Sequence, residues 1–356
     1  MTLAPAGEVR TLYHWATDRC EDEFIPDAPA RAFRRADGRM TLLATHRENW
    51  ALVGQDFTSL KPSCRSVLRS SEHRREGAGR LWIEATWTHD GRHIAALVSQ
   101  DLEEPTRREG CEKRGLPGRC WLNNILAARS ADMGESFSLL APSERMVATL
   151  GDRYPPGAQA RFGAFTTSNI VRQGDAYFMI AYVQGEGVQQ AGNCLFRTDD
   201  PFQPGRWRGW DGQGFAADLG VPGGRQSCTP LPSRALPGEV RSLTYDTRHA
   251  TWLAVFRARL ALPGDAQPVP GFYVAQSPDL LHWQAPRRIV AAPTRARIDD
   301  PDIVANYPSL LDPGSKSRNF DTIDSGRPVL LYTVQHLQAG RGSMNRDLRY
   351  LPLRVE

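Results

Sequence analysis

Five apolar runs recur along the chain, and each follows a turn rich in Gly and Asp. Each run holds six to eight residues rich in Val, Ile, Leu, Tyr and Phe. The runs start near residues 40, 94, 176, 251 and 329. A second short candidate strand precedes each turn, at residues 30–35, 83–88, 167–172, 240–245 and 307–312. Short apolar runs between turn residues predict five β-hairpins, and no long stretch has the period of an amphipathic helix.

A second repeat follows the hairpins. The stretch "RSADMGESF" at 129–137 places an Asp two residues after a Ser, with a Gly and an aromatic residue behind them. Ser and Asp side chains can accept hydrogen bonds from the backbone of such a turn, and Gly tolerates positive φ. Counted from Ser130, looser copies start at Gly54, Thr198 and Ser277, in steps of 76, 68 and 79 residues. These steps are typical of decorated β-propeller blades, which need roughly 40 to 50 residues.

The ordered series of strand, turn, strand and Asp turn favours a propeller over a β-sandwich or a pair of β domains. We predict an all-β chain with a single five-bladed β-propeller domain at residues 1–356, since no Gly/Ser-rich or Pro-rich hinge divides the sequence. The segment 348–355 is predicted to close the ring by pairing with strands near the N-terminus, because an open ring leaves a free sheet edge.

Composition narrows the range of partners and compartments. The net charge is +4, no basic run is present, and no apolar run approaches the length of a membrane span. We therefore expect neither nucleic-acid binding nor membrane insertion, and the oligomeric state stays open. Residues 1–15 hold no apolar signal core, so we expect no signal peptide within this chain.

The six cysteines lack metal-site spacing, and their even number allows three disulfides. We expect Cys111 to pair with Cys120 across a Gly-rich loop, with two more pairs among Cys20, Cys64, Cys194 and Cys228. Disulfides predict a periplasmic or secreted protein. Six unpaired thiols in a cytoplasmic protein are the alternative.

Candidate chemistry follows from the expected channel. The innermost strand of each blade lines that channel, so polar groups near the strand heads converge at its mouth. Carboxylates, guanidiniums, amides and aromatic faces are the groups that sugar sites use. The predicted carbohydrate-binding residues are Arg31, Arg35, Trp87, Asn169, Arg241, Tyr307 and Arg318.

The chain resembles the five-bladed β-propeller glycosidases, the group of arabinanases, xylosidases and invertases. "SPDLLHW" at 277–283, with "FYVAQ" before it, is similar to the blade-closing phrase of that group, and residues 27–45 resemble its first blade. The segments 194–212 and 306–322 also resemble a further family of bacterial propeller proteins. The resemblance implies a glycoside hydrolase that acts on a poly- or oligosaccharide.

The resemblance also implies roles for carboxylates at the channel mouth. Asp27 matches the first-blade base or nucleophile, and Glu84 matches the second-blade carboxylate by position, although it is Glu rather than Asp. The family carries a Glu proton donor on the first strand of the third blade, whereas residues 167–172 contain no acid. Glu186 and Asp101 are the candidates to replace it.

Two other functions remain open. The missing third-blade acid favours a propeller that binds glycan without cleaving it. Residues 130–137 fit the Asp-box of sialidases, and a sialidase-like hydrolase would use Arg35, Arg241 and Arg318 for a substrate carboxylate. No cofactor is predicted, with a structural calcium ion in the channel as the one possibility left open.

Overall fold

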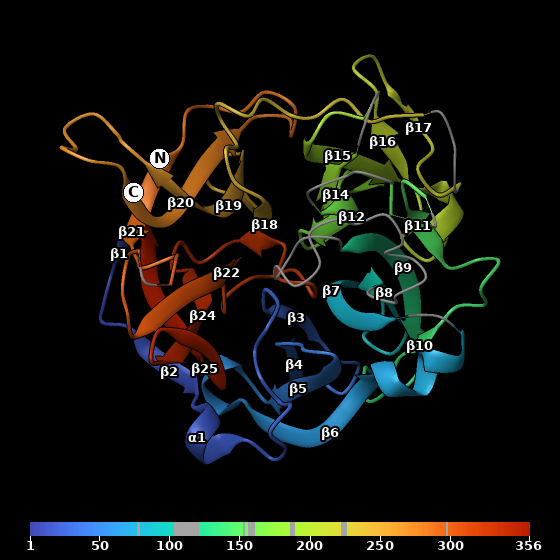
Figure 1. Cartoon of the computed structure of the whole chain (residues 1–356), viewed down its shortest axis with the longest axis horizontal. Coiled ribbons are helices and arrows are strands. Elements are labelled where there is room, and N and C mark those ends of the chain that lie inside the picture. The colour runs from blue at the N-terminus through green and yellow to red at the C-terminus, as the bar shows by residue number, and fades with distance from the viewer. Residues whose placement is uncertain are drawn as a thin grey trace.

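The computed structural model describes residues 1–76, 79–102, 121–151, 154–155, 161–185, 189–221, 226–296 and 298–356. Strands dominate the described residues and are arranged radially about a centre (Figure 1). Helix is confined there to α1 (Trp15–Asp18) and short 3₁₀ turns such as Phe57–Ser59, Ser70–Glu76 and Pro204–Arg206. The prediction of an all-β propeller is confirmed.

The strands of the described residues fall into five consecutive groups, here called blades 1 to 5. Blade 1 consists of β3 (Arg31–Arg34), β4 (Met40–Leu43), β5 (Glu48–Gly54) and β6 (Lys61–Arg69). Blade 2 consists of β7 (Arg80–Thr88), β8 (Ile94–Leu102), β9 (Leu122–Ser130), β10 (Ser138–Leu139) and β11 (Met146–Ala148). Blade 3 consists of β12 (Phe162–Thr167), β13 (Val171–Gln173), β14 (Ala176–Gln184), β15 (Gly192–Thr198), β16 (Arg208–Trp210) and β17 (Phe215–Ala217).

Blades 4 and 5 complete the ring. Blade 4 consists of β18 (Val240–Asp246), β19 (Thr251–Leu260), β20 (Val269–Ser277) and β21 (Arg287–Ala291), with β23 (Thr322–Ile323) parallel to β18. Blade 5 consists of β22 (Ile303–Leu311), β24 (Val329–Gln338) and β25 (Arg341–Val355), with β1 (Leu3–Pro5) and β2 (Arg10–Tyr13). The inner strands β3, β7, β12, β18 and β22 lie nearest the centre (Figure 1).

Each blade packs an apolar face on both of its neighbours. Successive residues of a strand point to opposite faces, so Trp252 of β19 packs toward blade 3 while Leu253 packs toward blade 5. In the same way, Leu330 of β24 joins the core with blade 4 and Leu331 joins the core with blade 1. These cores close a circle, which agrees with the predicted number of five blades.

The two chain ends meet in blade 5, as predicted. β25 pairs antiparallel with β1 at Leu3↔Val355 and with β2 at Arg10↔Tyr350. The N and C labels lie side by side in Figure 1, and Thr2 N donates to the carbonyl of Glu356 at 2.8 Å. This pairing covers the sheet edge that an open ring would expose.

Each of the four Asp turns follows the strand that is third when the blade is counted outward by strand pairing, namely β5, β9, β15 or β20. After β9, Ser130 Oγ donates to Asp132 Oδ1 at 2.7 Å, and Gly134 N donates back to Ser130 Oγ at 2.9 Å. Gly134 has a φ of +82°, which explains why the turn needs glycine there. The turns lie away from the channel and therefore report the fold rather than a reaction.

One predicted strand was misplaced. The inner strand of blade 3 spans Phe162–Thr167, and not 167–172. Ser168 interrupts the strand because its hydroxyl accepts from Ile180 N at 2.9 Å. Gly163 explains how β12 lies against blade 2, since a Cβ there would come within 1.9 Å of Asn123 O.

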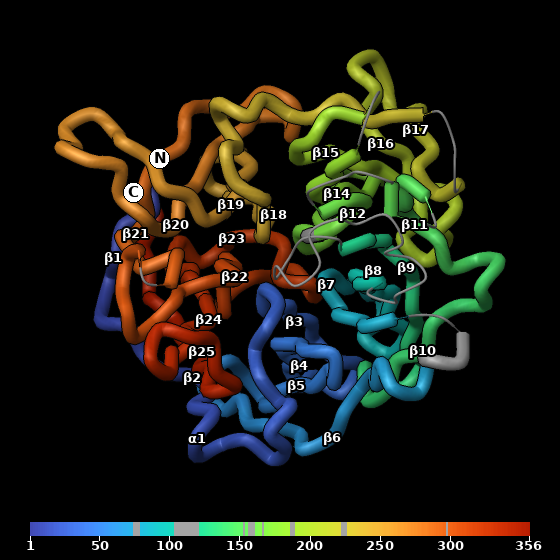
Figure 2. Tube along the Cα trace, viewed as in Figure 1, coloured from blue at the N-terminus to red at the C-terminus, as the bar shows by residue number. Residues whose placement is uncertain are grey.

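The connection between β22 and β24, residues 312–328, covers the end of the channel where the inner strands finish. It includes β23, which is labelled in Figure 2. Arg34 N of blade 1 donates to Arg318 O at 2.8 Å, Thr88 N of blade 2 donates to Asn319 Oδ1 at 2.8 Å, and Arg172 N of blade 3 donates to Asp321 Oδ2 at 3.1 Å. Tyr245 N of blade 4 donates to Asp321 O at 2.9 Å, so this one connection links blade 5 to the other four.

Two disulfides join the four cysteines that the structure describes. Cys20 pairs with Cys64 and Cys194 pairs with Cys228, which confirms two pairs among these residues. Cys111 and Cys120 lie outside the described residues, so that pairing stays a prediction. In the described part of the chain, no helix has the length and apolar character needed to cross a membrane.

Candidate functional site

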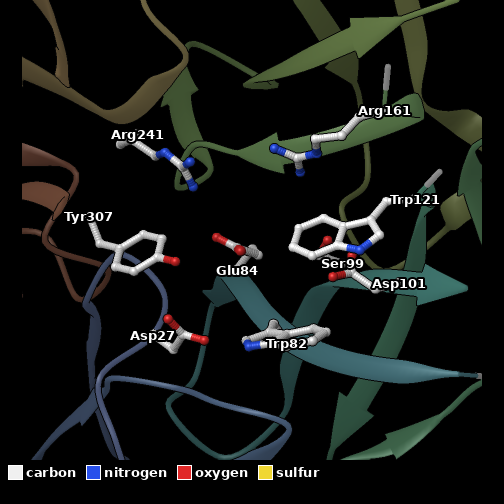
Figure 3. Close-up of a pocket in the computed structure, with 9 residues that line it drawn as sticks. All are labelled: Asp27, Trp82, Glu84, Ser99, Asp101, Trp121, Arg161, Arg241 and Tyr307. Atoms are coloured by element: carbon white, nitrogen blue, oxygen red, sulfur yellow. The ribbon is translucent and has the colours of Figure 1, made fainter. Parts of the chain in front are cut away.

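A cavity of about 120 Å³ lies at the end of the channel where the inner strands begin. Its lining residues are Asp27, Trp82, Glu84, Ser99, Asp101, Trp121, Arg161, Arg241 and Tyr307. Figure 3 shows the Glu84 carboxyl at the centre, with the other side chains arranged around it. Every blade contributes one of these residues at or near its inner strand. Asp27 and Arg161 precede β3 and β12. Glu84, Arg241 and Tyr307 belong to β7, β18 and β22.

The alternation of β7 determines which of its residues reach the channel. Trp82 and Glu84 line the cavity, and Thr86 lines a second cavity of about 20 Å³ that also contains Arg31 and Asn169. Trp87 points to the opposite face and packs in the core between blades 2 and 3. The prediction of Trp87 as a sugar-binding residue is therefore wrong.

Glu84 is buried and incompletely hydrogen-bonded. Its Oε2 accepts no hydrogen bond from the described residues. Burial raises the pKa of the Glu84 carboxyl, and this effect exceeds the opposing influence of Arg241 and Arg31. A carboxyl in this setting retains its proton to higher pH than usual and can donate it to a substrate.

Asp27 has the opposite setting. Arg346 Nη1 donates to Asp27 Oδ1, and a paired guanidinium favours the charged carboxylate. Burial lowers the pKa of Arg346 to about 10, so this residue remains protonated at neutral pH. His46 Nε2 lies 3.8 Å from Asp27 Oδ2, and burial lowers the His46 pKa to about 4, which leaves that ring neutral at pH 7.

Arg161 and Arg241 share one carboxylate. Arg241 Nη2 lies 2.5 Å from Glu239 Oε2, and Arg161 Nη1 lies 3.5 Å from Glu239 Oε1. The Arg161 guanidinium also stacks over Phe165, with its Cζ atom 3.7 Å from the ring centroid. Both guanidiniums are thus held in place beside the cavity.

Tyr307 occupies a backbone conformation that is rare for a residue with a side chain. Its φ is +53°, at a register shift of β22 between Asn306 and Ser309. Asn306 Oδ1 accepts from Tyr307 N at 2.9 Å and supports this conformation. Arg241 Cζ lies 5.3 Å from the Tyr307 ring centroid, and burial raises the Tyr307 pKa. Such strain at a cavity is often linked to function.

Asp101 and Ser99 come from β8 and share its channel-side face. Asn123 Nδ2 of β9 donates to Asp101 Oδ1. Trp121 lies beside Asp101 in Figure 3 and lines the same part of the cavity. The cavity therefore combines three carboxyl groups with two indole rings.

Arg31 lies on the channel axis beneath the cavity. Its guanidinium donates to carbonyls of Ala30 (3.2 Å), Glu84 (2.5 Å), Thr167 (3.1 Å) and Arg241 (2.8 Å), and to the hydroxyl of Ser309 (3.3 Å). Each blade supplies one of these acceptors. A calcium ion at this point of the channel would meet the guanidinium rather than free carbonyl oxygens, so these residues do not fit such an ion.

The remaining predicted residues lie elsewhere. Arg35 follows the last residue of β3, where it donates to Thr41 Oγ1 and pairs with Glu135. Arg318 donates to the carbonyls of Arg34 and Arg35 at 3.0 and 3.1 Å, so both arginines belong to the far end of the channel. The predicted cluster of Arg35, Arg241 and Arg318 does not form, because Arg241 lies at the mouth.

Asn169 joins blades 3 and 4 by donating to Leu243 O at 2.8 Å. Glu186 lies outside the described residues.

The structure thus brings together Asp27, Glu84, Asp101, Arg241 and Tyr307 from the predicted set. Trp82, Ser99, Trp121 and Arg161 were not predicted. Trp82 stands two residues before Glu84, so strand alternation alone was a sufficient signal for it. Arg161 directly precedes β12, and the misplaced inner strand of blade 3 concealed it.

No family model and no curated protein matches the sequence. The structure is similar to an exo-1,5-α-L-arabinanase from a bovine ruminal metagenomic library, with 12% identity, 93% of this chain and 95% of that chain covered, and a TM-score of 0.51. It is similar to the catalytic domain of the Coprinopsis cinerea GH62 α-L-arabinofuranosidase at 10% identity, 99% and 96% coverage and a TM-score of 0.51. The endo-1,5-α-L-arabinanase of Thermotoga petrophila RKU-1 aligns at 11% identity, 92% and 71% coverage and a TM-score of 0.52. The resemblance to propeller glycosidases is confirmed for the fold, which is what identities this low can establish.

Proposed function

We propose that the protein is a glycoside hydrolase that acts on a poly- or oligosaccharide at the mouth cavity. The observation that carries this proposal is the opposite setting of two carboxyl groups in one cavity. Glu84 is buried with a raised pKa, whereas Asp27 is paired with Arg346. Glycoside hydrolysis requires one protonated and one ionised carboxyl group on the two sides of the scissile bond. The fold shared with propeller glycosidases supports the same conclusion.

The proposed reaction uses Glu84 as the proton donor. As the bond from the anomeric carbon to the glycosidic oxygen breaks, the Glu84 proton passes to that oxygen and the alcohol leaves. Asp27 either attacks the anomeric carbon, with water later releasing the sugar, or takes a proton from a water molecule that attacks directly. In both cases one water molecule is consumed, and NMR of the first anomer released distinguishes the two routes.

The other cavity residues are proposed to hold the sugar. Trp82 and Trp121 are both half-buried and present indole rings to the cavity, where a sugar ring can pack. The hydroxyls of Ser99 and Tyr307 are available to hydrogen-bond sugar hydroxyls. Asp101 is the other acid that lines the cavity and would bind a sugar hydroxyl or assist Glu84.

A glycan screen that scores both cleavage and binding tests the proposal. Wild type is compared with Asp27→Asn and with Asp175→Asn, a matched exposed control in the turn between β13 and β14. We expect cleavage by wild type and the control, and binding without cleavage by Asp27→Asn. Equal cleavage by all three proteins would exclude Asp27 from the reaction.

A propeller that binds glycan without cleaving it is the second candidate. It is favoured by one observation, namely that β12 contains no acid and Arg161 stands directly before it, where the resemblance implies an acid on that strand. Binding without cleavage by wild type in the same screen would select this candidate.

We also propose that the protein works in an oxidising compartment, in the periplasm or outside the cell. The two disulfides support this, because such bonds do not persist in a reducing cytoplasm. Mass spectrometry of non-reduced peptides from protein isolated from its own cells tests it, and the same spectra decide whether Cys111 and Cys120 are paired. Reduced Cys20 and Cys194 in that material would contradict the proposal.

A further inference from the structure

Two guanidiniums, those of Arg161 and Arg241, line the cavity beside Glu84. Both pair with the one carboxylate of Glu239, and a third guanidinium, that of Arg257, interacts electrostatically with Arg241 and Glu239. The hydrogen bond of Arg257 goes to a neutral acceptor, Thr294 O, at 3.5 Å. Two guanidiniums of the cavity thus share one carboxylate, and Glu84, proposed above as the proton donor, supplies no second full counter-charge while it keeps its proton.

Arg161 and Arg241 also carry hydrogen-bond donors that no described residue uses. The buried Nε atoms of both residues donate no hydrogen bond to any described residue. Each guanidinium meets Glu239 through one terminal nitrogen. A buried donor without an acceptor destabilises the folded protein, so sites of this kind are retained where a ligand supplies the acceptor.

The two guanidiniums are fixed before any ligand arrives. Glu239 holds both, Phe165 supports Arg161 from one face, and Tyr307 lies beside Arg241. Figure 3 shows both reaching toward Glu84, with Asp27 and Trp82 on the other side of that carboxyl. Preorganised guanidiniums bind planar anions well, because the fork geometry matches a carboxylate and little side-chain entropy is lost. A neutral hydroxyl would satisfy one donor, whereas a carboxylate would also supply a second negative charge to the two guanidiniums that share Glu239.

We propose that the cavity takes a sugar that bears a carboxylate, and that the guanidiniums of Arg161 and Arg241 bind this carboxylate. The inference rests on the proposed function, since it names the class of sugar for the same site. Uronic acids and sialic acids share the required chemistry, and the experiment below separates them.

The test compares sugars that differ only in the acidic group. Calorimetry measures the binding of glucuronic acid against glucose, and of galacturonic acid against galactose, with N-acetylneuraminic acid and glucose 6-sulfate as further probes. Cleavage of the corresponding 4-nitrophenyl and 4-methylumbelliferyl glycosides is measured in parallel. We expect the carboxylate member of at least one pair to bind tenfold or more tightly than its neutral partner, with the difference shrinking at high salt.

The variants Arg241→Gln and Arg161→Gln assign the effect, with Arg206→Gln on the outer turn of blade 3 as the matched control. Each cavity variant is expected to lose at least tenfold in affinity for the acidic sugar and less than threefold for the neutral one. Thermal melting checks folding, and Arg161→Gln keeps the test decisive if Arg241→Gln does not fold.

The outcomes separate this inference from the proposed hydrolase. Cleavage of neutral glycosides with no preference for the acidic members would overturn the inference and leave the hydrolase intact. Tight binding of acidic sugars without cleavage of any glycoside would support the inference and overturn the hydrolase. Preference for N-acetylneuraminic acid over both uronic acids supports a carboxylate site of the sialic-acid class. Binding of the sulfate alone would overturn the carboxylate assignment.

Discussion

The two ends of the channel use the same kinds of residue in opposite ways. At the far end, Asp312 accepts hydrogen bonds from Asp324 N (2.7 Å) and from the N and Oγ of Ser325 (2.8 and 2.6 Å). Asn319 exchanges two hydrogen bonds with Thr88, at 2.8 and 2.9 Å. At the mouth, Glu84 Oε2, Arg161 Nε and Arg241 Nε are buried without any such partner in the described residues.

The difference arises from what covers each end. Residues 312–328 cross the far end and accept hydrogen bonds from each of the other four blades. The polar side chains of the mouth instead surround a cavity. Satisfied polar groups stabilise a fold, whereas unsatisfied ones reduce stability and are retained where they serve function. The comparison predicts that substitutions at the mouth change activity most and that those at the far end change stability most.

The largest effect is expected for Asp27→Asn. Loss of the base or nucleophile should reduce kcat on the glycan identified by the screen by about 10⁴-fold. The melting temperature should fall moderately, because Arg346 loses its charged partner. Steady-state kinetics at a temperature well below the melting point measures kcat without interference from unfolding. Retention of more than a tenth of the activity would remove Asp27 from the reaction.

Glu84→Gln should have an effect that depends on the leaving group. A poor leaving group needs the Glu84 proton, so kcat should fall by about 10³-fold, while a dinitrophenyl glycoside should lose less than tenfold. Since burial raises the pKa of Glu84, wild-type activity should fall as pH rises through that raised pKa. This alkaline limb should vanish from the pH profile of the variant. An equal loss on both leaving groups would assign Glu84 a role in binding instead.

Asn319→Ala tests the far end. The variant removes both hydrogen bonds to Thr88, so the free energy of unfolding should fall by roughly 1–3 kcal/mol. Because Asn319 does not line the mouth cavity, kcat should stay within twofold of wild type. Urea unfolding and steady-state kinetics measure the two quantities, and a large loss of kcat in a folded variant would contradict the division between the two ends.

The smallest effect concerns the pH dependence of stability. Because the folded pKa of Glu84 is raised, its contribution to stability is present below the unfolded pKa and is lost as pH rises through the folded pKa. The variant Glu84→Gln removes this loss of stability with rising pH. The melting temperature of the variant relative to wild type should therefore increase between pH 4 and pH 8, by roughly 2–4 °C. A constant difference across this range would show that Glu84 does not change protonation on unfolding.

Local patterns in the sequence predicted the features that depend on neighbouring residues. Hairpins and Asp turns follow from short runs of residues, and the positions of Asp27 and Glu84 follow from their places just before the first strand of blade 1 and on the first strand of blade 2. Arg35 was misassigned because composition near a strand does not show which end of the channel a side chain reaches. Trp87 was misassigned although its odd spacing from Glu84 predicts the opposite face of β7.

Features that depend on contacts between distant parts of the chain could not be predicted from the sequence. Ser168 ends β12 through a hydrogen bond to the following hairpin, and the connection 312–328 acquires its role only when four other blades surround it. The Arg161 and Arg241 pair forms through Glu239, from strands of different blades. Strand periodicity contains no information about these contacts, since they arise only when the ring is assembled.

The position of Arg31 has a consequence for the order of folding. Its acceptors lie 53, 136, 210 and 278 residues further along the chain, apart from the adjacent carbonyl of Ala30. An intermediate that lacks one blade leaves the guanidinium in water or buried with too few acceptors, so incomplete rings gain little stability. Contacts at such separations form late and slow the folding of a chain. Blade 1 is therefore fully stabilised only after blade 5 has formed. In this way Arg31 favours a complete ring over partly assembled ones.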